Sequence, residues 1–186
     1  MIFLDLIFPP LCNECKERCS TGALCPSCWQ LSAPPDPVGR CRHCFQEIDE
    51  KNALCDQCKR QPHLYSARAY VFDWGAPVWH LRRDADAAMA GFALLQWVQL
   101  EWPWPDLVIP MPDSASKAIG SFLADFLERP LVAASRVHHH PEDLQFLLID
   151  AGNPLSSLKK VETLLLEAFP KRIHLLSLSP YDPFDT

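Results

Sequence analysis

Apolar runs and amphipathic segments alternate along the second half of the chain. Residues 114–128 and 157–169 repeat apolar side chains at helical spacing, and residues 77–97 read as helical with a break. Three short runs, residues 107–111, 131–134 and 146–150, are mostly apolar, which indicates buried strands. The predicted strands are residues 68–73, 107–111, 131–134, 146–150 and 173–178.

From residue 107 onward the predicted order is strand, helix, strand, strand, helix, strand. This alternation is typical of an α/β domain with a mainly parallel sheet, which we place at residues 67–186. The chain has 186 residues, more than one domain usually needs, so we expect a separate small module at residues 1–66.

The cysteines are confined to that small module. All nine lie between Cys12 and Cys58, and the 128 residues that follow contain none. Eight of them form four Cys-x-x-Cys pairs. Cys12 and Cys41 are 29 residues apart, and Cys25 and Cys55 are 30 apart. This regular offset indicates two tandem copies of one unit, which a proline-rich linker separates.

Paired Cys-x-x-Cys turns supply four thiolates, the ligand set of a structural zinc site. We therefore predict a small double zinc-ribbon module with two zinc ions per chain, folded largely by the metal because so short a segment buries little core. The predicted ligands are Cys12, Cys15, Cys25 and Cys28, and Cys41, Cys44, Cys55 and Cys58. Pairing within each copy is favoured, but spacing alone also permits an interleaved arrangement. Cys19 is left over as an ordinary thiol.

The compartment bears on this interpretation, because a disulfide framework needs oxidising surroundings. Residues 1–10 are apolar but short, lack a basic region and contain Asp5, so they do not fit a signal peptide. No run reaches the roughly 18 apolar residues of a membrane helix. We expect a cytoplasmic protein without a membrane span. A redox role for the pairs is disfavoured by their four regularly spaced copies.

The charge balance argues against strong nucleic-acid binding. The chain has a formal net charge of −6, and residues 1–70 hold eight basic and eight acidic residues. Eight thiolates with two zinc ions would make this module negative, so it lacks the counterion release that drives nucleic-acid affinity. Lys59 with Arg60, and Arg40 with Arg42, form small basic patches that keep single-stranded DNA as an alternative partner.

Several features together resemble the ComF/GntX family. They are the apolar stretch Leu6-Ile7-Phe8-Pro9, the four cysteine knuckles, residues 24–29 and the strand-like Ala67-Arg68-Ala69-Tyr70. The resemblance implies that the zinc module is joined to a type I phosphoribosyltransferase-like domain. It also implies a link to competence for DNA uptake, with a protein partner in the DNA-uptake machinery.

In domains of that family, two acids after a strand hold the ribose of phosphoribosyl pyrophosphate (PRPP), and a loop at a helix N-terminus receives its 5′-phosphate. The corresponding segment is residues 146–157, in which Asp150 matches the first acid. Ser156 and Ser157 are the candidate phosphate ligands, and Mg²⁺ would accompany PRPP. The alternative role for either serine is a helix N-cap.

This PRPP segment departs from the family pattern. Ala151 replaces the second acid, the Thr-Thr-Gly core is absent, and Pro154 removes an amide. A basic family stretch after residue 112 and another long family segment between residues 136 and 145 are also missing, so the domain is truncated. We therefore expect a ComF-like accessory protein that is non-catalytic or weakly active. The alternatives are a phosphoribosyltransferase that uses PRPP and Mg²⁺, and a single-stranded DNA-binding accessory protein.

Overall fold

The computed structural model describes residues 11–12, 15–19, 24–48, 54–60, 64–73 and 87–180. Its first helices are short and lie in the cysteine-rich part, and the longer elements follow. The elements are α2 (Pro26–Gln30), α3 (Asp56–Arg60), β1 (Ala67–Tyr70), α4 (Ala87–Leu100), β2 (Leu107–Pro110), α5 (Ser114–Leu127), η2 (Ala134–His139), β3 (Gln145–Asp150), α6 (Leu155–Leu166) and β4 (Arg172–Ser177). The prediction of an α/β domain after the cysteine-rich part is confirmed.

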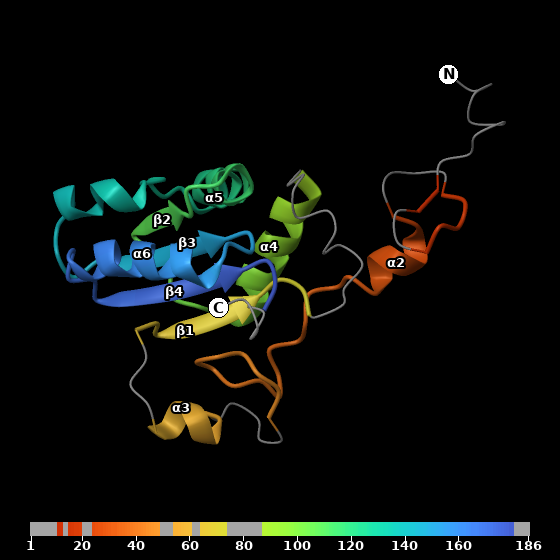
Figure 1. Cartoon of the computed structure of the whole chain (residues 1–186), viewed down its shortest axis with the longest axis horizontal. Helices are drawn as coiled ribbons and strands as arrows, with labels where there is room; N and C mark the ends of the chain where they lie inside the picture. The colour runs from red at the N-terminus through yellow and green to blue at the C-terminus, as the bar shows by residue number, and fades with distance from the viewer. Residues whose placement is uncertain are drawn as a thin grey trace.

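The strands form one parallel sheet in the order β1-β4-β3-β2 (Figure 1). The central pair, β3 and β4, is in register from Gln145 opposite Arg172 to Asp150 opposite Ser177. Because all four strands run the same way, their carboxyl ends meet at one edge of the sheet. Asp150, the candidate PRPP acid, ends β3 at that edge.

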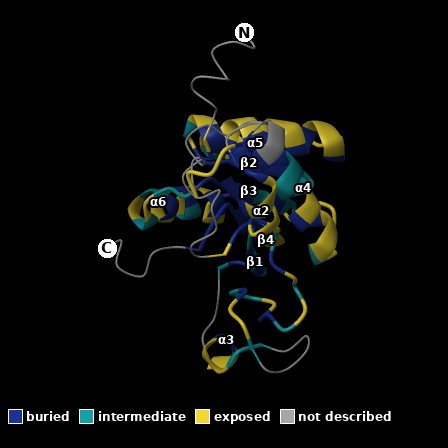
Figure 2. Cartoon of the chain, turned by 90° about the vertical axis from the view of Figure 1, so that its right-hand side faces the viewer, coloured by how far each residue is buried: buried dark blue, intermediate teal, exposed yellow. Residues whose placement is uncertain are grey.

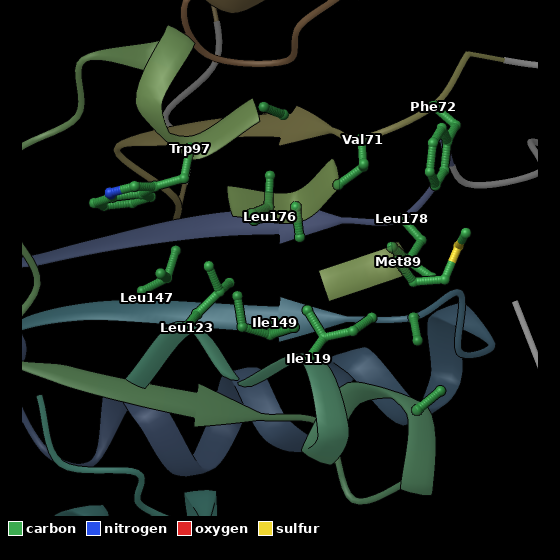
Figure 3. Packing of buried hydrophobic residues seen from close by; sticks show 14 of the residues in the cluster. Val71, Phe72, Met89, Trp97, Ile119, Leu123, Leu147, Ile149, Leu176 and Leu178 are labelled. Carbon is green, nitrogen blue, oxygen red and sulfur yellow. The ribbon is translucent and has the colours of Figure 1, made fainter. Parts of the chain in front are cut away.

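Side chains alternate between the two faces of the sheet, so the central strands are buried on both sides. Leu147 and Ile149 of β3 pack toward α4 and α5, whereas Phe146 and Leu148 pack toward α6. Figure 3 shows side chains of the first of these layers, including Trp97 of α4, which lie over one face of the sheet. Exposed residues lie mainly on the outer surfaces of the helices (Figure 2).

Helix α5 begins and ends close to the predicted limits, for local reasons. The Asp113 carboxylate caps its start by accepting a hydrogen bond from the Ser116 amide at 2.8 Å. Ile119 and Leu123 are buried against the sheet at the predicted helical spacing. The helix stops at Glu128, whose φ of 53° is left-handed.

The predicted strand at residues 131–134 is wrong. Leu131 makes a single parallel bridge with Val108, and the Val132 amide donates to the Val108 carbonyl at 2.9 Å. The 3-10 helix η2 then starts at Ala134 and packs with α6 on the face opposite α5. At this bridge the chain passes from the sheet face covered by α5 to the face covered by α6. Pro130, which has no amide hydrogen, precedes it.

The other predicted boundaries shift by a few residues. Helix α4 extends three residues beyond the predicted end at residue 97, and residues 77–86 of that prediction lie outside the described ranges. Helix α6 starts two residues before the predicted residue 157 and ends at Leu166. Within the part of the chain that the structure describes, no helix combines the length and hydropathy needed to cross a bilayer.

The cysteine-rich module contacts the α/β domain at two separate places, and α2 and α3 lie apart in Figure 1. The ring of Trp29 in α2 stacks on Phe92 of α4 with a centroid distance of 5.4 Å. Ahead of α3, the Phe45 ring meets Tyr70 of β1 edge-on at 5.2 Å. Each cysteine unit therefore has its own attachment to the α/β domain.

Candidate metal centres and the carboxyl edge of the sheet

The first knuckle of each cysteine unit is a tight turn with the same hydrogen bonds. In the first unit, the Cys12 amide donates to the Glu17 carbonyl at 2.8 Å and the Lys16 amide donates to the Cys12 carbonyl at 3.0 Å. In the second unit, the equivalent bonds start from Cys41 and Phe45, at 2.8 and 2.9 Å. The duplication predicted from spacing therefore extends to individual backbone hydrogen bonds.

The second knuckle of each unit lies at the start of a short helix. The Cys28 amide approaches the Cys25 sulfur at 3.5 Å at the start of α2, and the Cys58 amide approaches the Cys55 sulfur at 3.4 Å at the start of α3. Both helical knuckles therefore place a backbone N–H group beside the sulfur of their first cysteine.

The sulfurs gather into two groups of four, each drawn from one unit. Within each group all ligand atoms lie within 4.8 Å of one another, close enough for one metal ion to contact them all. The groups are Cys12, Cys15, Cys25 and Cys28, and Cys41, Cys44, Cys55 and Cys58. The structure therefore has the sequential arrangement and not the interleaved one.

Cys19 stands outside both groups, as expected. Its thiol is buried and donates to the Leu24 carbonyl at 3.2 Å.

The electrostatics of the second group favour a bound cation. Burial raises the pKa of the Cys44 thiol to about 11. Burial also opposes ionisation of Cys41, but backbone amides, including that of Cys55 at 3.3 Å, lower the pKa of Cys41 to about 6. A divalent cation stabilises all four thiolates at once, so metal binding would release protons from this group.

Arg40 anchors the second cysteine unit to the α/β domain, a role that the sequence analysis missed. Its side chain is 9% exposed and donates to Asp73 at 2.8 Å, to Glu47 at 3.1 Å and to the Phe45 carbonyl at 3.2 Å. Nearby, the Tyr70 hydroxyl donates to the Cys44 carbonyl at 3.4 Å, and burial raises the pKa of Tyr70 to about 12. The knuckle is thus tied to the residues at and just beyond the end of β1.

At the carboxyl edge of the sheet, Asp150 is 1% exposed and is bound by its own loop. Asn153 donates to the same Asp150 oxygen from its amide at 3.0 Å and from its side chain at 2.7 Å. The Asn153 side chain also reaches Asp113, at 2.7 Å. Burial opposes ionisation of Asp113, but hydrogen bonds from Ser116 and Asn153 lower its pKa overall. One asparagine thus bridges two carboxyl groups.

The loop after β3 turns its polar groups inward. The Ala151 amide donates to the Ser116 hydroxyl at 2.8 Å, inside the protein. Asp113 is a favoured N-cap residue directly before the amphipathic segment at residues 114–128, which is a signal in the sequence, although its link to this loop depends on the tertiary fold. Asn153 carried no recognisable signal.

The two candidate phosphate ligands lie in the first turn of α6. Ser156 is exposed and Ser157 is half-buried. Neither is the N-cap, because that position is Pro154, which makes no side-chain cap. The N-cap alternative for these serines is therefore wrong. Asp150 lies before the loop and the serines lie after it.

The basic side chains of Lys59 and Arg60 lie on α3, and two tryptophans, Trp102 and Trp104, follow α4. Lys59 on α3 forms an ion pair with Asp56 at 3.5 Å, and Arg60 beside it is exposed. Trp102 packs edge-on against Trp97 at 5.7 Å, whereas Trp104 is 57% exposed.

Comparison of the chain with protein-family models, with curated protein sequences and with solved structures gave no match.

Proposed function

We propose that this protein is a non-catalytic accessory protein whose N-terminal module is folded by two zinc ions. The observation that carries the proposal is the pair of four-cysteine groups, each with its sulfurs within 4.8 Å of one another. Catalytic zinc sites keep an open position for water or substrate, whereas four protein thiolates close the coordination sphere. Thiolates also favour zinc over Mg²⁺ and Ca²⁺, which prefer oxygen ligands.

The carboxyl edge of the sheet supports a non-catalytic role. Asp150 is almost completely buried and accepts two hydrogen bonds from Asn153, so its carboxylate holds the loop together. The Ala151 amide, which would otherwise be available to a phosphate, is bonded to Ser116. Binding the ribose of PRPP would require these internal bonds to break.

The resemblance to the ComF/GntX family extends the proposal to a biological role. We place this protein among the accessory factors of DNA uptake, in contact with a protein of that machinery. Reduced thiolates require a reducing compartment, which supports a cytoplasmic location.

A phosphoribosyltransferase that uses PRPP and Mg²⁺ is the second candidate. It is favoured by Asp113 and Asp150, whose positions at the carboxyl ends of β2 and β3 are where open parallel sheets bind their ligands. In that case Asp150 would hold the ribose, and Ser156 and Ser157 the phosphate.

Isothermal titration of PRPP with Mg²⁺ into the zinc-loaded protein separates the two candidates. The accessory role predicts no binding heat and no release of pyrophosphate with any acceptor. The Asn153→Ala variant removes the side-chain amide that donates to Asp150. It tests whether freeing the Asp150 carboxylate creates a PRPP site that the parent protein lacks. Pyrophosphate release, or binding heat that Asp150→Asn removes, would establish the enzyme instead.

A further inference from the structure

A groove of about 800 Å³ lies between the second cysteine unit and β1. We infer that this groove, called the β1 groove below, binds an extended acidic peptide from a partner protein. The inference rests on the accessory role proposed above and names the chemistry of the partner. Its lining includes Arg42 and Phe45 of the knuckle, Ala67 and Arg68 of β1, and Trp102 after α4.

The walls of the β1 groove come from parts that are fixed independently. The knuckle is held by the Arg40 hydrogen bonds to Phe45 and to Asp73. On the opposite side, the Trp102 ring packs against Trp97 and lies 4.9 Å from the His174 ring. The groove therefore exists before any partner arrives, which lowers the entropic cost of binding.

Two arginines of the groove can bind the carboxylates of an acidic partner. Arg42 is exposed and Arg68 is half-exposed, with its guanidinium 4.4 Å from the Tyr65 ring centroid. Arg40 also lines the groove but is already paired with Asp73 and Glu47. Among the described lining residues Glu101 is the one acidic side chain. Cys41 of the second four-thiolate group also lines the groove, so Arg42 and Arg68 are the two positions at which carboxylates of a peptide make direct contacts.

The backbone of β1 favours a peptide in extended conformation. Among the described residues, β1 pairs only with β4, so it is an edge strand. The Ser66 amide donates to the Ile173 carbonyl of β4 at 2.8 Å. Because successive residues of a strand direct their amides to opposite sides, Ala67 directs its N–H and C=O away from β4, on the side of the groove. An added peptide strand can pair with these groups.

Apolar side chains complete the match to an alternating peptide. Leu54, Leu100 and Trp102 line the groove beside the arginines. A peptide that alternates acidic and apolar residues would place carboxylates near Arg42 and Arg68 and apolar side chains near Trp102. A single-stranded polynucleotide fits less well, because it needs a longer track of cations and several stacking rings.

Fluorescence anisotropy with a labelled peptide of alternating Glu and Val residues tests this inference on the zinc-loaded full chain. We expect saturable binding that weakens at least about tenfold in the double variant Arg42→Glu, Arg68→Gln, since two charge contacts are lost. The matched control is Lys117→Glu, Lys159→Gln, which changes two exposed cations on α5 and α6 and should bind as the parent does. The corresponding Lys-Val peptide should not bind.

Peptides with N-methyl groups on alternate residues test the backbone pairing without altering the protein. In an extended peptide, alternate N–H groups point to opposite sides. Methylation of the N–H groups that face β1 should abolish binding, and methylation of those that face away from β1 should leave it intact. Equal loss in both forms, no saturable binding, equal binding of the Lys-Val peptide, or binding of only an oligothymidylate would each overturn the inference.

Zinc content and PRPP titration on the same samples keep the two proposals separate. A sample with two zinc ions, no PRPP heat and no peptide binding contradicts the β1 groove inference alone.

Discussion

Lys16 and Phe45 occupy the same position in the two cysteine units, 29 residues apart, and share a left-handed backbone. Their φ angles are 61° and 64°, and each directly follows the second cysteine of its knuckle. A non-glycine residue in this conformation is strained by roughly 1 kcal/mol, so the surrounding turn must hold it there. The two units therefore share a strained left-handed residue as well as the same cysteine spacing.

Replacing Lys16 tests whether this turn supports metal binding. Lys16→Val places a β-branched residue in the left-handed region and should weaken zinc binding by the first unit roughly tenfold, whereas Lys16→Gly should not weaken it. Competition with a chromophoric chelator measures both effects. The second unit provides the internal reference, and equal affinities in all three proteins would show that the turn is not required.

Arg40 should contribute more to the free energy of unfolding than its exposed partner Glu47. Arg40→Leu removes three hydrogen bonds from a buried guanidinium and should lower the free energy of unfolding by about 2–3 kcal/mol. Glu47 is 83% exposed, so Glu47→Gln should change it by less than about 0.5 kcal/mol. Urea denaturation in excess zinc compares the variants. Similar losses in both would mean that Arg40 is not the anchor.

The Asn153 bridge predicts a strong effect of charge. Asn153→Asp removes the donor shared by Asp113 and Asp150 and adds a third carboxyl group, so we expect a loss of about 2–4 kcal/mol at neutral pH. Ser156→Ala is the matched control on the same loop and helix, and should stay within about 0.5 kcal/mol because Ser156 makes no cap. Thermal unfolding with zinc present measures both. A fully stable Asn153→Asp protein would contradict the bridge.

His174 predicts a pH dependence of stability. Burial of its ring, with a smaller contribution from Arg172, lowers its pKa from 6.5 to about 4. Between these values the unfolded chain binds a proton that the folded protein excludes, so stability present above pH 6.5 is lost as the pH falls toward 4, by at most about 3 kcal/mol.

The free energy of unfolding should therefore rise more steeply with pH in the parent than in His174→Gln over this range. Any loss of zinc in acid affects both proteins equally, so it drops out when the two are compared. His138→Gln, at an exposed position, is the control. Parallel stability curves for the parent and His174→Gln would rule out this contribution.

The sequence predicted the features that depend on local periodicity. The parallel α/β class, the limits of α5 to within one residue and the separation of Cys19 from the other eight thiols all follow from spacing and hydrophobic pattern. The duplication favours pairing within each unit, but spacing alone also permits the interleaved arrangement, and the three-dimensional path of the chain decides between them.

Features that depend on tertiary contacts were beyond the sequence. Residues 131–134 have the composition of a strand, but one isolated bridge, between Leu131 and Val108, joins them to the edge of β2 before η2 begins. Asn153 and Arg40 are ordinary polar residues in the sequence, and their roles depend on partners 40 and 33 residues away, Asp113 and Asp73. Long-range hydrogen bonds of this kind leave no periodic signal.

The zinc-to-protein ratio of the purified chain, measured by elemental analysis, tests the central claim most directly. We predict two zinc ions per chain, because each four-thiolate group closes one site. Cys25→Ser and Cys55→Ser should each lose about one zinc, and Cys19→Ser should lose none. Retention of both zinc ions by either ligand variant, or a parent protein that holds disulfides in place of metal, would contradict the account.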